Sequence, residues 1–107
     1  QEVALADVRR AVEMFRKYNL NIVGLVENMS YFMCGHIDEP IEIFGHGGGK
    51  KLSEELDLPL LGNVPIELGI RAGGDVGIPL MVSDPDSEIG RTFQAIAQNI
   101  LAEKEPV

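Results

Sequence analysis

Residues 20–27 read LNIVGLVE, a nearly continuous run of apolar and β-branched side chains. Such a run is typical of a strand that is covered on both faces in the interior of a parallel sheet. A strand at the edge of a sheet does not need this covering, and only two or three short strands are apparent in the chain. We therefore expect further strands beside residues 20–27, contributed by a larger α/β domain. Alternatively, the two faces of this strand are covered within a compact small sheet or by a second copy in an exchanged dimer.

On either side of this strand the hydrophobic spacing predicts helices. Residues 2–18 place apolar side chains at helical intervals, and Asn19 is a plausible stop. Residues 28–46 are irregular or partly extended. A glycine run then precedes the short amphipathic helix predicted by KKLSEELDL, and residues 59–64 form a second short apolar strand that ends at Pro65.

The remaining third of the chain is mostly helical by the same criteria. Residues 66–78 predict a short helix ended by glycines, and Ile78 to Val82 a further extended piece. Ser83 or Asp84 is the predicted cap of a final helix with Pro85 in its first turn. The expected fold class is α/β, a three-layer parallel sheet with flanking helices and right-handed crossovers.

The composition narrows the classes of function. A length of 107 residues allows one domain, and no apolar run approaches the ~18 residues that cross a bilayer. The net charge of −8 repels nucleic acid and anionic membrane surfaces, so neither is an expected partner. One Cys and no signal-peptide pattern favour a reducing, cytoplasmic location. The start at Gln1, without Met, suggests a processed or truncated chain.

The glycine run at residues 45–49, before Lys50 and Lys51, stands where a helix N-terminus favours an anion. A phosphate-binding P-loop has the pattern G-x-x-x-x-G-K-[ST]. Here Phe44 occupies the first glycine position, and Lys51 replaces the hydroxyl residue that would bind Mg²⁺. The run is therefore predicted to be a flexible turn that admits positive φ, and not the catalytic P-loop.

Cys34 and His36 both carry atoms that bind metals. Structural zinc takes four ligands, often from C-x₂-C pairs, and Ile37 stands where the second thiol would be. Two chains meeting at a twofold axis bring two thiolates, short of the four that an iron–sulfur cluster usually takes. A lone Cys is also commonly a small buried apolar residue.

Asn28 follows the strand of residues 20–27, and Pro65, Ile66 and Glu67 follow the strand of residues 59–64. Ligands of open α/β sheets bind at the carboxyl ends of strands, so neighbouring strands would bring both turns to one edge. An Asn amide can donate to and accept from a purine edge, and a rigid Pro turn presents backbone groups to it. The alternative is that Asn28 only caps a turn.

These motifs, V-E-N-M-S followed by I-F-G-H-G-G-G and then L-L-G-N-V-P-I-E, resemble the Mrp/ApbC family over essentially the whole chain. Members of this family are P-loop ATPases that carry iron–sulfur clusters and are related to ParA and MinD. The resemblance implies that residues 1–107 are the C-terminal half of a single P-loop NTPase domain, with the Walker A half absent. The chain alone is then expected to be inactive, while its parent protein is an ATPase.

The resemblance also implies roles for individual residues. Asn28 and the turn of Pro65, Ile66 and Glu67 would surround the base of ATP, which binds with Mg²⁺ in the full-length protein. Cys34 would ligate a 4Fe–4S cluster shared across a homodimer, for delivery to apo iron–sulfur proteins. The family uses C-x-x-C there, and this chain keeps one thiol whether Cys34 matches the first Cys, with Ile37 at the second position, or the second Cys, with the first lost in a short deletion. A cluster-free ParA/MinD-like switch and a non-catalytic dimerisation module are the alternatives.

Overall fold

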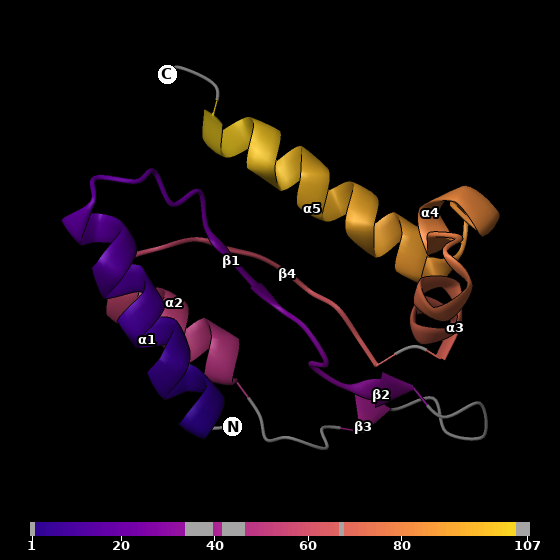
Figure 1. Ribbon diagram of the computed structural model, residues 1–107, viewed down its shortest axis with the longest axis horizontal. Helices are drawn as coiled ribbons and strands as arrows, with labels where there is room; N and C mark the ends of the chain where they lie inside the picture. Colours follow the sequence, from indigo (N-terminus) through magenta and orange to yellow (C-terminus); the bar gives the residue numbers. More distant parts are fainter. Residues whose placement is uncertain (1, 34–39, 42–46, 67, 105–107) are drawn as a thin grey trace.

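The computed structural model describes residues 2–33, 40–41, 47–66 and 68–104. Figure 1 shows the order of the elements along the chain, which is mainly helical at both ends and extended in the middle. The elements are α1 (Glu2–Lys17), β1 (Leu25–Glu27), β2 (Phe32–Met33), β3 (Pro40–Ile41), α2 (Gly48–Leu56), β4 (Leu60–Asn63), α3 (Leu68–Val76), α4 (Leu80–Ser83) and α5 (Glu88–Lys104).

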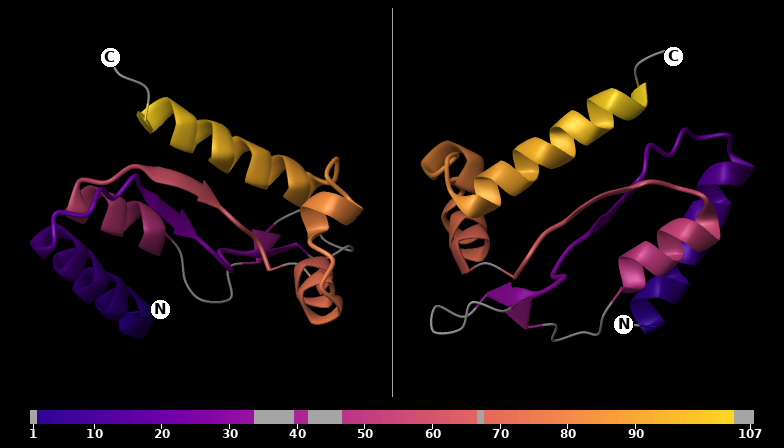
Figure 2. Two further views of the ribbon diagram at one scale, coloured as in Figure 1. Left: turned by 45° about the horizontal axis from the view of Figure 1, so that its top comes forward. Right: turned by 180° about the vertical axis from the view of Figure 1, so that it is seen from behind.

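The centre of the molecule is a parallel pair of strands, β1 and β4, in which Leu25 faces Leu60 and Glu27 faces Asn63. Helices α1 and α2 lie on one side of this pair and α5 lies on the other, so three layers are formed (Figure 2). β2 and β3 make a separate antiparallel pair. The α/β class and the three-layer arrangement are confirmed.

The core lies between β4 and α5. Its buried members come from β4, the residue after it and α5, and half-buried apolar side chains from α3, α4 and the end of α5 pack around them. The buried residues are Leu61, Val64, Ile89 and Ile96. Gly62 allows this close packing, because a Cβ there would lie 2.6 Å from Cγ1 of Ile96.

The helix ends predicted from local signals are confirmed. Asn19 adopts a φ of 57° two residues after the end of α1, and Gly77 adopts a φ of 76° directly after α3. Gly47 adopts a φ of 73° at the start of α2, as the glycine run predicted. These left-handed conformations suit Gly and Asn better than other residues, so the sequence signal is strong at such positions.

Two predictions near the C-terminus are wrong. Ile78 to Val82 were expected to be extended, but Pro79 lies at the start of the one-turn helix α4, and its carbonyl accepts the Val82 N–H at 2.9 Å. The final helix was expected to be capped by Ser83 or Asp84. It begins at Glu88, and Ser87 Oγ accepts the Gly90 N–H at 3.0 Å.

The predicted strand at residues 20–27 is regular only over Leu25–Glu27, and Leu20 is 55% exposed. Among the residues that the structure describes, β1 pairs with β4 alone. Val26, in the middle of the run, is 45% exposed. The interior position of this strand therefore stays a prediction about a larger sheet.

Candidate functional site

The carboxyl ends of β1 and β4 continue side by side beyond the regular strands. The Val64 N–H donates to the Glu27 carbonyl at 2.8 Å, and the Ser30 N–H donates to the Val64 carbonyl at 2.9 Å. One step further, the Ile66 N–H donates to the Tyr31 carbonyl at 2.7 Å. These bonds bring the turn that contains Asn28 next to the turn at residues 65–66, on the edge where open α/β sheets bind ligands.

Asn28 is exposed at this edge. Its Oδ1 accepts the N–H of Met29 at 2.9 Å, and Met29 has a φ of 52°, which is uncommon for a residue other than Gly, Asn or Asp. The side-chain oxygen of Asn28 thus helps to hold a tight turn, which agrees with the alternative that Asn28 caps a turn. The amide NH₂ has no hydrogen-bond partner in the described part of the chain and can donate to a ligand.

The other predicted site residues are distributed as follows. Pro65 and Ile66 are half-buried and lie beside the Asn28 turn through the backbone bonds given above. Glu67 and Cys34 lie outside the described residues. The structure thus brings together three of the five residues that the sequence pointed to.

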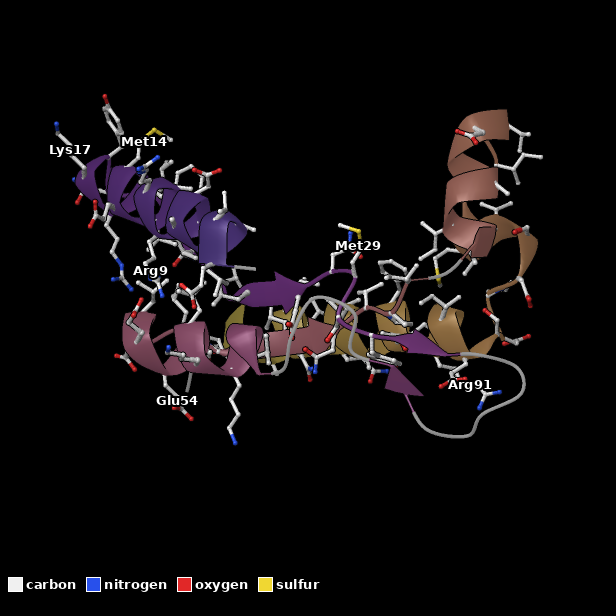
Figure 3. All side chains as sticks on the ribbon, turned by 90° about the horizontal axis from the view of Figure 1, so that it is seen from below. Arg9, Met14, Lys17, Met29, Glu54 and Arg91 are labelled. Carbon is white, nitrogen blue, oxygen red and sulfur yellow. The ribbon has the colours of Figure 1, made fainter. Side chains whose placement is uncertain are left out.

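A groove of about 610 Å³ opens beside this edge. It runs from the first half of α1 along β1 to the glycines at the start of α2, and its lining includes the Asn28 turn. Met29, which is 53% exposed, projects from the turn toward the same side of the molecule as α1 (Figure 3). The lining combines apolar side chains of α1 and β1 with the polar groups of the strand end.

Sequence reasoning missed the contact between Glu27 and Gly49. A Cβ placed on Gly49 would lie 2.8 Å from Oε2 of Glu27 and 3.1 Å from its Cβ. The last residue of β1 thus lies against the first turn of α2, whose N-cap residue Gly47 provides no side-chain hydrogen bond. A carboxylate is favourable beside the exposed N–H groups of a helix start. The glycine at position 49 was the available signal, because it permits this approach.

Tyr31 links the same edge to α5. Its half-buried position raises the pKa of its phenol, and the nearby carboxylate of Glu88 raises it further. Both effects disfavour the phenolate, because the ionised form would lose hydration and meet a negative charge.

The described residues contain no group of three or more His, Cys, Asp or Glu side chains that could hold a metal ion. The potential ligands Cys34, His36 and His46 lie outside those ranges. Among the helices of the same ranges, none combines the length and the apolar character needed to cross a membrane.

Comparison with known proteins identifies the family. Residues 1–101 match the family described as "ParA: NUBPL iron-transfer P-loop NTPase". The chain is 48% identical over 101 residues to the iron-sulfur cluster carrier protein of Synechocystis, covering 94% of the chain and 29% of that protein. It is 46% identical over 105 residues to the iron-sulfur cluster transfer protein NUBPL of Dictyostelium discoideum, covering 98% of the chain and 32% of that protein.

Two solved structures share the fold. MinD of Pyrococcus horikoshii, in complex with Mg-ADP, superposes with a TM-score of 0.68 at 25% identity, covering 95% of this chain and 39% of that one. The cell division ATPase MinD of Pyrococcus furiosus gives a TM-score of 0.66 at 26% identity, covering 92% and 37%. The chain thus spans about a third of the length of its relatives. It belongs to the ParA family of P-loop NTPases, in the group described as NUBPL iron-transfer proteins.

Proposed function

We propose that this chain is the C-terminal portion of a nucleotide-binding protein that carries iron–sulfur clusters, and that it supplies the base side of an ATP site. The observation that supports this role is the backbone ladder that holds the Asn28 turn beside residues 65–66 at the carboxyl edge of parallel strands. The relatives are named iron-sulfur cluster carrier and transfer proteins, and these names support the proposal that the protein carries iron–sulfur clusters.

The phosphate side of the site would come from elsewhere in the longer polypeptide. The glycine turn before α2 is followed by Lys50 and Lys51 and has no Ser or Thr at the position where a P-loop binds Mg²⁺. Glu27 also places a carboxylate against the first turn of α2, which disfavours a phosphate there. We therefore expect no ATP hydrolysis by residues 1–107 alone.

The open edge of β1 supports a place where the rest of the sheet would bind. On the outer side of β1, no strand is paired in the described residues, and the groove leaves Val26 accessible. An additional strand of the longer polypeptide would therefore pair with β1, as the apolar run at residues 20–27 predicts.

Replacement of Asn28 tests the base site. In the full polypeptide, Asn28→Ala removes the NH₂ donor and the oxygen that holds the turn, so we expect ATP affinity to fall about 10-fold or more, as for the loss of one good hydrogen bond. Isothermal titration calorimetry with a non-hydrolysable ATP analogue measures this change.

Asn21→Ala is the matched control, because Asn21 is an exposed residue of the same type before β1, away from the carboxyl edge. Its affinity for the analogue should equal that of the unmodified protein. Equal affinities in all three proteins would show that Asn28 does not contact the nucleotide.

We also propose that Cys34 contributes one thiolate per chain to a cluster held between two copies of the protein, for transfer to apo iron–sulfur proteins. A 4Fe–4S cluster usually takes four thiolates, so two copies supply only half of the usual set. Anaerobic reconstitution with iron and sulfide should give a brown dimer, and Cys34→Ser should remain colourless. A colourless unmodified protein that still dimerises with ATP would instead indicate a cluster-free nucleotide switch.

A further inference from the structure

Met29 has a backbone conformation that its side chain does not favour. Three described residues other than Gly have a positive φ, namely Asn19, Met29 and Asp57. Asn19 and Asp57 are of the types that adopt this conformation most readily, and each lies at a helix end, where its N–H donates to a carbonyl of the helix. Met29, with a φ of 52°, instead follows a strand and carries a long apolar side chain. Neither explanation applies to it.

The side chain of Met29 is not required by the core of the described chain, because it is 53% exposed. The turn is held locally, since the Oδ1 of Asn28 accepts the Met29 N–H at 2.9 Å. Gly would adopt the same φ at lower cost. Residues in such costly conformations are concentrated at sites that bind ligands. A contact of the Met29 side chain with a ligand would explain why the costlier residue stands here.

Met29 lies between two polar residues at the carboxyl edge of the β1–β4 pair. Asn28 and Ser30 flank it in the chain, and all three line the groove of about 610 Å³. Figure 3 shows the Met29 side chain projecting outward from its turn. β1 ends at Glu27, so an additional strand paired with β1 would fill the groove along the strand, and the end of the groove at Met29 lies beyond that pairing.

The charges of the groove indicate which kind of ligand fits. Its described lining contains the carboxylates of Glu2 and Glu27 but no Lys or Arg, so it repels a phosphate more than an uncharged ring. The NH₂ of Asn28, which has no hydrogen-bond partner in the described part of the chain, can donate to an acceptor at the edge of a ring. The thioether of Met makes favourable contacts with aromatic rings. An uncharged heterocycle with acceptor atoms at its edge meets these conditions.

We propose that Met29 packs against the ring of the nucleobase whose edge Asn28 contacts, and that this contact sets part of the affinity for the nucleotide. The inference rests on the proposed function, because it takes the base of ATP as the occupant. Asn28 binds the edge of the base, and Met29 provides an apolar surface against its ring. Consecutive Cα atoms are only about 3.8 Å apart, so one base can reach both side chains.

Substitutions of Met29 separate the side chain from the backbone. Met29→Gly removes the apolar surface and relieves the positive φ, so the thermal unfolding midpoint of the full polypeptide should not fall. Its affinity for a non-hydrolysable ATP analogue, measured by isothermal titration calorimetry, should nevertheless fall about 5- to 10-fold. Met29→Leu keeps an apolar side chain of similar size and should retain most of the affinity. Undiminished binding by Met29→Gly would overturn the proposal.

Met14→Ala is the matched control. Met14 is 49% exposed, similar to Met29, but it lies in α1 and outside the described lining of the groove. Figure 3 shows the two side chains well apart. The affinity of Met14→Ala for the analogue should equal that of the unmodified protein. Equal losses in Met14→Ala and Met29→Gly would show that the effect does not arise at the base, which contradicts the proposal.

Methyl NMR tests the contact directly in the full polypeptide labelled with ¹³C at the methionine methyl groups. The ATP analogue should move the Met29 signal upfield, because the methyl group lies against an aromatic ring, and Met29→Gly identifies this signal by its loss. Tripolyphosphate, which has no base, should not cause the shift, and Met14 should respond to neither probe. A Met29 signal that the analogue leaves unchanged would show that the base does not lie against this side chain, and would overturn the proposal.

The base site and the Met29 contact can fail separately. If the unmodified protein bound no ATP analogue, the proposed function and the contact would both be overturned. If Asn28→Ala weakened binding while Met29→Gly did not, the base site would stand and only the contact with Met29 would be overturned.

Discussion

Tyr31 lies where the strand edge meets the start of α5, and its surroundings disfavour ionisation. Its half-buried position raises the pKa of its phenol above the usual value of about 10, and Glu88 contributes in the same direction. The folded protein therefore favours the neutral phenol more than the unfolded chain does. The stabilisation that results is complete below the pKa of the unfolded chain and is lost as the pH rises through the higher folded-state pKa.

This difference predicts that the free energy of unfolding falls as the pH rises above about 10. Tyr31→Phe keeps the ring and cannot ionise, so its stability should decline less over the same alkaline range. Urea unfolding midpoints of the full polypeptide, measured at several pH values, test this expectation. Tyr18→Phe, at a side chain that is 68% exposed, is the control and should follow the unmodified protein. Parallel declines of the two variants would contradict the role of Tyr31.

Residues of the candidate site differ in how far the sequence could reveal them. Asn28 and the turn at residues 65–66 were predicted to meet because parallel neighbouring strands place their carboxyl ends on one edge, which is a rule of topology. The contact between Glu27 and Gly49 depends on where α2 lies above β1. That position is set by tertiary packing, including the buried side chain of Leu52, and no local pattern encodes it.

At the scale of elements, helix ends were predictable where a single residue decides them. Asn19 and Gly77 adopt positive φ within two residues of the ends of α1 and α3, and few other residues do so at low cost. The start of α5 was missed because several cap residues stand close together. Ser87 is the cap, since the preceding turn packs back on the helix: a Cβ at Gly90 would lie 2.2 Å from the Pro85 carbonyl oxygen.

Strand length was less predictable than helix length. Residues 20–27 are apolar almost throughout. Regular pairing, however, is limited to Leu25–Glu27, which pair with the four-residue strand β4. The register also shifts between Leu25 and Val26. A strand is defined by its neighbours, so an apolar run predicts burial better than it predicts the residues that pair.

At the scale of the whole molecule, burial is uneven. Val64, directly after β4, and Leu52 of α2 are 2% and 3% exposed, whereas Val26 on β1 is 45% exposed. An apolar strand of this kind is normally covered by the rest of its domain, so its accessibility is typical of part of a larger domain. The chain matches 29% and 32% of the lengths of two of its relatives.

Hydrogen exchange at Val26 tests whether β1 lies inside a wider sheet. The Leu25 N–H donates to the Pro59 carbonyl at 2.9 Å and the Glu27 carbonyl accepts from Val64, so both residues face β4. Successive residues of a strand alternate in direction, and the N–H of Val26 therefore faces the open edge. If another strand pairs there in the full polypeptide, the amide of Val26 should be protected as strongly as that of Leu25. NMR-detected exchange measures both, and rapid exchange of Val26 beside a protected Leu25 would show that β1 remains an edge strand.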